Sequence, residues 1–185
     1  LKEVRNKLFL PVLRGLATDF VSCSELAGKA MFKNREFTVL PNMIRTEKYH
    51  FDENVRTLVR KKMSATDKFV VGTVGRLAEQ KNPFFAMDVF ECLQKQVQNA
   101  EYWWVGSGPL EKSVQDYINQ KGLSENVRLL GSRDDVTDLY QGMDVFFLPS
   151  LFEGLPVTGV EAQAMGLPMV VSDTVTKEMV YTDLV

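Results

Sequence analysis

Two glutamates, Glu153 and Glu161, lie eight positions apart around Pro156, and an apolar run from Val145 to Leu148 precedes them. This order predicts a buried strand, a loop and then a helix, which is where open α/β sheets bind ligands. Pro156 suits the first helical position, and no Ser, Thr, Asp or Asn directly before it caps the helix. Such an uncapped start attracts an anion, most commonly a phosphate. The acids cannot bind that phosphate, so they indicate recognition of hydroxyl groups on a sugar and a ribose.

A second group of candidate residues follows the apolar run from Phe69 to Gly75. Gly75 lets the backbone approach a ligand closely. Arg76 and Lys81, five positions apart on one loop, can both reach a diphosphate. Simpler interpretations compete with this one, because Arg and Lys in loops are usually solvated surface charges. A single glutamate near a helix start likewise often does no more than favour the helix dipole.

The elements that must position these residues alternate regularly from Lys68 onward. We expect strands over residues 69–75, 102–106, 127–131, 145–148 and 168–172, and helices over residues 83–97, 109–120, 136–143 and 156–165. Nearly continuous apolar strands alternating with helices predict an α/β fold with a doubly wound parallel sheet of the Rossmann-like kind. The aromatic pairs Trp103-Trp104 and Phe146-Phe147 fall within strands, so we expect them in the core.

The first 50 residues follow a different pattern. We expect a helix over residues 2–17 that Pro11 interrupts, a strand at 20–23, a helix at 24–32 capped by Ser24, and a strand at 37–40. Pro41-Asn42 then breaks the pattern, and residues 52–62 form a polar, helical connector. The sequence therefore predicts two parts, residues 1–48 and 49–185.

The composition is that of an ordinary soluble globular protein, with 45% hydrophobic residues, 25% charged residues and a net charge of −2. This charge gives no support for nucleic-acid binding. Cys23 and Cys92 are too few and too isolated for a disulfide framework, and with the single His50 they do not support a zinc site. They indicate a cytoplasmic protein with reduced thiols. No apolar run reaches the ~20 residues of a membrane span. Because the chain begins without Met, we expect a fragment of a longer protein.

Longer strings of the sequence resemble one enzyme family. Residues 144–150 (Asp-Val-Phe-Phe-Leu-Pro-Ser), Glu153-Gly154 and residues 161–171 (Glu-Ala-Gln-Ala-Met-Gly-Leu-Pro-Met-Val-Val) resemble the donor-site signature of retaining GT-B glycosyltransferases, in which seven residues separate two glutamates. Gly75-Arg76 followed by Gln80-Lys81 is similar to the phosphate-binding loop of that family. The resemblance implies that residues 49–185 are a nucleotide-sugar-binding domain truncated at its C-terminus, and that residues 1–48 are the end of the N-terminal domain and the hinge.

The resemblance also implies a role for each candidate residue. Arg76 and Lys81 would neutralise the leaving diphosphate, whose growing charge fixed cations stabilise. Glu153 would contact the sugar, and these three residues are the expected catalytic set. The expected donor-binding set is Gly75, Gly106, Ser132, Arg133, Gly154, Leu155, Val157, Thr158 and Glu161. Glu161 would bind the ribose, and the loop at 131–133 would contact the base.

The implied activity is transfer of a sugar, with retention, from a nucleoside diphosphate sugar, with a UDP-sugar favoured, to a glycan or glycolipid. The saccharide or lipid-linked acceptor would bind through the missing N-terminal domain, no cofactor or metal would be needed, and the chain alone would transfer poorly. Polysaccharide biosynthesis and peripheral association of the full protein with the inner face of the membrane also follow from the resemblance. The alternative is a non-catalytic nucleotide-binding or interaction module on a Rossmann-like scaffold. Against an NAD-type module, no acid follows the second strand, which ends at Val105-Gly106.

Overall fold

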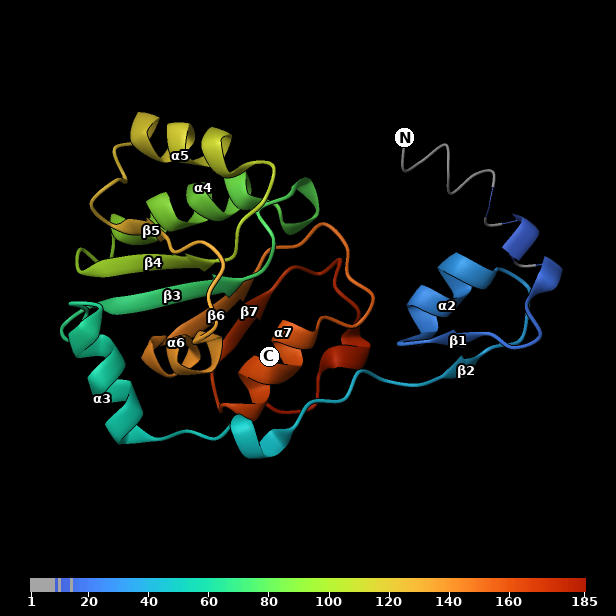
Figure 1. Ribbon diagram of the computed structural model, residues 1–185. Coiled ribbons are helices and arrows are strands. Elements are labelled where there is room, and N and C mark those ends of the chain that lie inside the picture. The colour runs from blue at the N-terminus through green and yellow to red at the C-terminus, as the bar shows by residue number, and fades with distance from the viewer. Residues whose placement is uncertain (1–8, 10, 14) are drawn as a thin grey trace. The chain divides into compact units, whose positions relative to one another are not determined.

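The computed structural model describes residue 9, residues 11–13 and residues 15–185. The chain divides into two compact units, Leu1–Met43 and Ile44–Val185. The smaller unit contains β1 (Val21–Ser22), α2 (Glu25–Phe32) and β2 (Thr38–Val39), with β1 and β2 parallel (Figure 1). Ser24 caps α2 as predicted, because its hydroxyl accepts the Ala27 N–H at 3.1 Å. The helix expected over residues 2–17 lies largely outside the described residues.

The larger unit contains the predicted alternation of strands and helices. Its elements in chain order are η1 (Thr46–Lys48), α3 (Glu53–Lys62), β3 (Phe69–Val74), η2 (Glu79–Lys81), α4 (Pro83–Gln94), β4 (Ala100–Val105), α5 (Glu111–Gln120), β5 (Val127–Leu129), α6 (Val136–Gly142), β6 (Val145–Leu148), α7 (Val157–Ala164), β7 (Met169–Val171) and η3 (Lys177–Met179). The five strands form one parallel sheet in the order β5-β4-β3-β6-β7. This arrangement confirms the α/β fold with a parallel, Rossmann-like sheet.

Helices cover both faces of this sheet. Figure 1 shows α4 and α5 over one face, and α3, α6 and α7 over the other. The alternation of side chains along β4 follows from this layering, because successive residues of a strand point to opposite faces. Tyr102 and Trp104 pack with the helices α4 and α5, whereas the ring of Trp103 lies against Gly142 at the end of α6.

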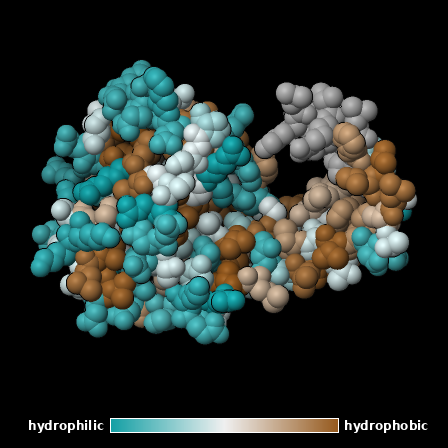
Figure 2. Space-filling view, viewed as in Figure 1, coloured by the Kyte–Doolittle hydropathy of each residue, from teal (hydrophilic) through white to brown (hydrophobic). Residues whose placement is uncertain are grey.

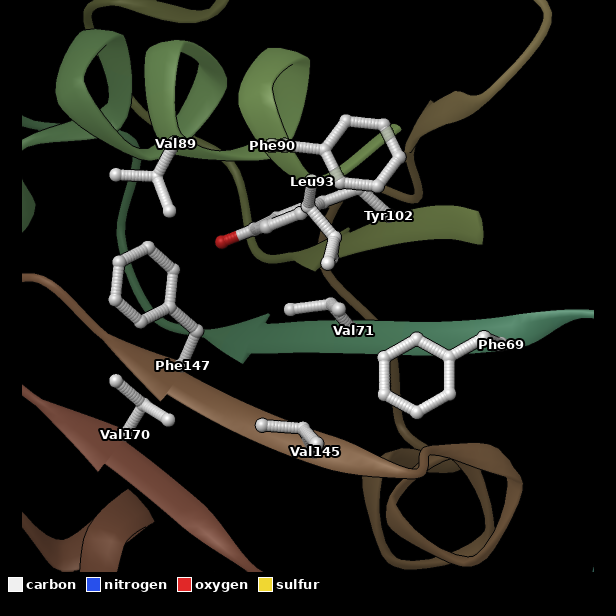
Figure 3. Close-up of a pocket in the computed structure, with 9 residues that line it drawn as sticks. All are labelled: Phe69, Val71, Val89, Phe90, Leu93, Tyr102, Val145, Phe147 and Val170. Atoms are coloured by element: carbon white, nitrogen blue, oxygen red, sulfur yellow. The ribbon is translucent and has the colours of Figure 1, made fainter. Parts of the chain in front are cut away.

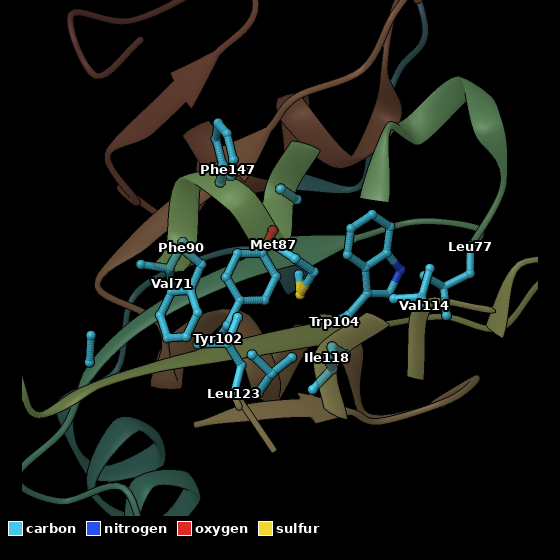
Figure 4. Packing of buried hydrophobic residues seen from close by; sticks show 13 residues of the cluster. Val71, Leu77, Met87, Phe90, Tyr102, Trp104, Val114, Ile118, Leu123 and Phe147 are labelled. Atoms are coloured by element: carbon cyan, nitrogen blue, oxygen red, sulfur yellow. The ribbon is translucent and has the colours of Figure 1, made fainter. Parts of the chain in front are cut away.

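The main hydrophobic core lies between the sheet and the helices α4 and α5. Figure 4 shows its largest side chains, among them Phe90, Tyr102 and Trp104, which are fully buried. The expectation that both aromatic pairs are core residues is confirmed, since Trp103 and Phe146 are also fully buried and Phe147 is nearly so. The outer surface of α5 is hydrophilic (Figure 2).

A hollow of about 280 Å³ lies on the same face of the sheet, beside α4. Figure 3 shows that its lining comes from the middle of the sheet and from one side of α4, and that the side chains are almost entirely apolar. No charged residue lines it, so the hollow cannot hold a diphosphate. Among the described residues, no helix is long and apolar enough to cross a membrane.

One carboxylate, that of Asp144, links the first residues of strands β3 and β6 to helix α3. Asp144 precedes β6, and its side chain accepts hydrogen bonds from Arg56 at 2.5 Å, from Arg60 at 3.0 Å and from the backbone N–H of Val70 at 2.8 Å. Burial raises the pKa of Asp144, but the hydrogen bonds from Val70 and the two guanidinium groups outweigh it and lower the pKa below its usual value. The carboxylate thus joins α3 to β3 and β6.

We therefore expect Asp144→Asn to lower the free energy of unfolding at pH 7 by about 3 kcal/mol, because it leaves two guanidinium groups without their anion. A lowered pKa in the folded state means that the stabilisation is present above the unfolded pKa of about 4 and is lost as the pH falls. Urea unfolding between pH 3 and pH 7 should accordingly show a smaller acid-induced loss in the variant than in the wild type.

Asp116→Asn is the matched control, because Asp116 pairs with Lys112 on an exposed helix face, with side chains 64% and 88% exposed. It should change stability by less than about 0.5 kcal/mol. A variant Asp144→Asn that keeps the wild-type dependence of stability on pH would contradict this account.

Candidate functional site

The loops that follow β3, β4 and β5 meet at the carboxyl edge of the sheet. Gly75 donates its N–H to the Val105 carbonyl at 2.9 Å, and Gly106 donates to the Gly131 carbonyl at 2.7 Å. Gly106 has a φ of +130°, and a Cβ there would lie 2.2 Å from the Gly75 carbonyl oxygen. Only glycine fits such a position without moving the backbone. The structure therefore brings Gly75 and Gly106 of the expected donor-binding set into direct contact.

Ser132 belongs to the same edge. Its backbone N–H donates to the hydroxyl of Ser107 at 3.1 Å, which ties the loop after β5 to the loop after β4. The Gly-Ser-Gly segment at 106–108 is thus used partly for tight packing, since a Cβ on Gly108 would lie 2.2 Å from the Leu77 carbonyl oxygen.

The loop after β3 meets the loop after β6 through an ion pair. Lys81, at the end of η2, places Nζ 2.7 Å from Oε1 of Glu153. Both side chains are largely buried, with 14% and 9% of their surface exposed. Two of the three expected catalytic residues therefore lie in contact, although 72 positions separate them in the sequence.

Gln80 reinforces the connection between these two loops. Its side-chain amide donates to the Phe152 carbonyl at 3.0 Å and to Oε2 of Glu153 at 3.3 Å, and its backbone carbonyl accepts the Leu151 N–H at 2.8 Å. Both oxygens of Glu153 are therefore engaged by residues of η2. This fixes the carboxylate at the entrance to α7.

Arg76 contrasts with Lys81. It follows Gly75 at the end of β3, and its exposed side chain makes no hydrogen bond or ion pair with any residue that the structure describes. An exposed guanidinium at the carboxyl edge of the sheet is available to an anionic ligand. It offers five N–H donors in the planar arrangement that suits phosphate oxygens.

The start of α7 has the uncapped character that the sequence predicts. Pro156 is the residue at the N-cap rather than the first helical residue, and no side chain caps the helix. Within the described part of the chain, the N–H groups of Val157 and Thr158 make no hydrogen bond, and the buried hydroxyl of Thr158 has no partner. Gly154 and Leu155 form the turn before the helix, with Gly154 half-buried and Leu155 buried.

Glu161 lies one turn inside α7, and its carboxylate accepts two hydrogen bonds from tyrosines. The Tyr49 hydroxyl donates to Oε1 at 2.6 Å, and the Tyr140 hydroxyl donates to Oε2 at 3.0 Å. Burial, followed by the hydrogen bond to Glu161, raises the pKa of Tyr49 to about 12. Both hydroxyls therefore remain protonated donors at neutral pH.

Arg133 is placed differently from the other expected donor-binding residues. Its guanidinium forms a two-point contact with Asp135, at 2.8 and 2.7 Å, and that hydrogen bond lowers the pKa of Asp135 to about 2. The pair faces a groove between α3 and α6 that Lys62 and Leu139 also line. Its contact with a donor base stays a prediction.

Sequence reasoning did not identify Tyr49, Tyr140 or Gln80 as site residues. Gln80 is adjacent to a predicted residue, so its position in the Gln-Lys pair is a usable signal. Tyr49 and Tyr140 carry no such signal, because 112 and 21 positions separate them from Glu161. Only the fold brings them to the carboxylate. Among the described residues, no cluster of three or more His, Cys, Asp or Glu side chains could hold a metal ion.

Comparison with known proteins places the chain among glycosyltransferases. The profile of the family described as "Glycosyl transferases group 1" matches residues 68–183. EpsF of Bacillus subtilis, whose name assigns it provisionally to the glycosyltransferases, is 33% identical over 95% of this chain and 48% of its own length. A UDP-Gal:alpha-D-GlcNAc-diphosphoundecaprenol alpha-1,3-galactosyltransferase of Escherichia coli is 33% identical over 75% of this chain and 37% of its own length. The chain thus spans half or less of the length of these relatives.

Solved structures show the same fold. HepE of Anabaena, crystallised in complex with UDP-glucose, superposes with a TM-score of 0.84 over 94% of this chain and 50% of its own, at 20% identity. The five-stranded parallel sheet flanked by helices is the fold of the GT-B glycosyltransferases, as the resemblance in sequence implied.

The side chain of Lys81 packs directly against the backbone of Gly75. A Cβ on Gly75 would lie 2.8 Å from Cε of Lys81, so in Gly75→Ala the end of the lysine side chain must shift. Because the clash is with the end of a flexible side chain that Glu153 also holds, we expect a loss of about 1 kcal/mol in the free energy of unfolding, measured in urea.

The double-mutant cycle with Lys81→Ala is the control, because removing the lysine side chain removes the clash. The cost of Gly75→Ala should then fall below about 0.5 kcal/mol. The same loss of stability in both backgrounds would show that the added methyl group clashes with the backbone and not with Lys81.

Proposed function

The chain belongs to the glycosyl transferases group 1 family, and we propose that its larger unit binds the nucleoside diphosphate sugar donor of a retaining transferase, a UDP-sugar being favoured. The observation that carries this proposal is the contact between Lys81 and Glu153 at the uncapped start of α7. A cation, a carboxylate and two free backbone N–H groups thus lie at one edge of the sheet. A sugar diphosphate needs that combination of groups.

Different groups of the site suit the three parts of the donor, namely the diphosphate, the sugar and the ribose. Lys81, Arg76 and the N–H groups of Val157 and Thr158 suit the diphosphate, because cations and a helix start both attract phosphate. Glu153 then accepts hydrogen bonds from the sugar. Glu161, one turn further along the helix, accepts them from the ribose.

In this proposal the transfer needs no general base from the chain. The bond between the anomeric carbon and the diphosphate oxygen breaks, and the acceptor oxygen forms a bond to the same face of that carbon. The departing phosphate oxygen takes the proton of the acceptor hydroxyl, so atoms and charge balance. Arg76 and Lys81 stabilise the negative charge that grows on the diphosphate, and they do so without reorganising during the step.

The donor and the acceptor are supported by the relatives. The Escherichia coli relative is named for transfer from UDP-Gal to a lipid-linked saccharide, and HepE was crystallised with UDP-glucose. We extend both features to this protein as a UDP-sugar donor and a saccharide or lipid-linked acceptor. The acceptor would bind to the part of the polypeptide that corresponds to the uncovered half of the relatives, and the enzyme would act at the inner face of the membrane.

Isothermal titration with UDP, GDP, ADP and NAD tests the donor class. We expect binding of UDP and none of NAD, because no acid at the end of β4 can accept an adenosine ribose. Glu161→Ala should raise the Kd of UDP about tenfold, since it removes hydrogen bonds to a charged group. Glu153→Ala should raise the Kd of a UDP-sugar, because the sugar loses its hydrogen-bond acceptor. It should not raise the Kd of UDP, because Lys81 is then free to bind the diphosphate.

Glu125→Ala is the control, because Glu125 is exposed on the turn between α5 and β5 and makes no hydrogen bond or ion pair with the site residues that the structure describes. It should leave all Kd values unchanged. Binding of NAD alone, or of none of the four ligands, would refute the transferase proposal and favour a different nucleotide-binding or interaction module.

A further inference from the structure

The carboxylate of Glu161 is held from two sides by tyrosine hydroxyls. Tyr49 contacts one carboxylate oxygen, at 2.6 Å, and Tyr140 contacts the other, at 3.0 Å. A glutamate on a helix surface can normally rotate about its side-chain bonds. Here two hydrogen bonds in different directions fix the plane of the carboxylate.

Tyr49 itself is held in place by the backbone that follows it. The side chain of Gln141, in α6, accepts the Asp52 N–H at 3.0 Å and donates to the His50 carbonyl at 2.8 Å. Gln141 is buried, with 6% of its surface exposed. A buried amide that satisfies two backbone groups of one segment fixes that segment, so Tyr49 does not reach Glu161 by chance rotation of a free chain.

Tyr140 is fixed by packing. Only 1% of its surface is exposed, and its ring lies 5.7 Å from the ring of Phe146 in β6. Burial, more than the neighbouring Glu161, raises the pKa of the Tyr140 hydroxyl well above its ordinary value. The hydroxyl therefore stays a neutral donor.

The Glu161 carboxylate can accept further hydrogen bonds beyond those from the two tyrosines. An ionised carboxylate has about four lone-pair positions on its two oxygens. Each tyrosine uses a position on one oxygen, which leaves acceptor capacity on both. Two neighbouring hydroxyls of a ribose can donate to both oxygens of one carboxylate, provided that the carboxylate faces them in a fixed orientation.

We propose that Tyr49 and Tyr140 are positioning residues that orient the Glu161 carboxylate to accept both hydroxyls of a ribose diol. This inference rests on the proposed function, in which Glu161 binds the ribose. It adds that discrimination between a ribonucleotide and its 2′-deoxy counterpart depends on residues that need not touch the ligand.

Comparing UDP with 2′-deoxy-UDP by isothermal titration tests this inference. In Tyr49→Phe the Kd of UDP should rise about five- to tenfold, because the carboxylate loses its orientation, whereas the Kd of 2′-deoxy-UDP should rise less than about twofold. Tyr140→Phe should shift the two ligands in the same unequal way. A general structural defect would weaken both ligands equally, so the ratio of the two Kd values isolates the positioning effect.

Tyr117→Phe is the matched control. The Tyr117 hydroxyl also donates to a carboxylate, that of Asp88 at 2.7 Å, but between α5 and α4. It should leave the ratio unchanged. Thermal unfolding of each variant reports whether it is folded, and Tyr49 is only half-buried, so Tyr49→Phe keeps the test decisive even where Tyr140→Phe is unstable.

Equal weakening of both ligands in Tyr49→Phe would overturn the inference while leaving the proposed function intact. Tighter binding of UDP by that variant would also overturn it, because Tyr49 would then occupy the position of the ribose. Failure of the wild type to bind UDP, GDP or ADP would instead refute the proposed function, and the inference with it. Should GDP or ADP bind in place of UDP, the same comparison is made with the matching 2′-deoxy nucleotide.

Discussion

The close approach of two backbone segments at Gly75 and Gly106 determines the geometry of the carboxyl edge of the sheet. A Cβ at Gly106 would lie 2.2 Å from the Gly75 carbonyl oxygen, so a larger residue would push the ends of β3 and β4 apart. The indole N–H of Trp104 donates to the same carbonyl at 2.9 Å and holds it from the core side. The loop that carries Arg76 and Lys81 leaves the sheet from this point. The glycine contact therefore helps to set the direction of this loop.

The ion pair between Lys81 and Glu153 is the next level of this organisation. Both side chains are largely buried. Separating them without giving each a new partner of opposite charge would therefore leave uncompensated charges in a region with little water. An ammonium group has three donors, so Lys81 can keep one bond to Glu153 while it turns the others toward a phosphate. In the structure Glu153 accepts one of these bonds, and in the proposed donor complex the others would face the diphosphate. The charge of Lys81 is thereby balanced, whereas that of Arg76 is exposed.

The sequence alone predicted the fold well, for identifiable physical reasons. Apolar strands such as Val145–Leu148 have the bounds that periodicity suggested, and Ser24 caps its helix as its residue type favours. Ends of elements were less certain: Pro156 is the N-cap of α7 and not its first helical residue, since its ψ of 113° is extended. For the site, types and spacing gave the two loops, but not that Lys81 and Glu153 touch. Contacts between distant segments depend on strand order, which local pattern does not encode.

The tyrosines around Glu161 could not be predicted from the sequence for the same physical reason. A tyrosine in a linker or near the end of a helix is ordinary in composition, and Tyr49 gains its role only because Gln141 fastens residues 50–52 to α6. Orientation of an acid is a property of several elements together, so it cannot be assigned to the segment that carries the acid. In a donor site built on one edge of a parallel sheet, the residues that touch the ligand come from loops and helix starts. The residues that we propose orient them come from the segment after η1 and from α6, and their sequence neighbours carry no motif.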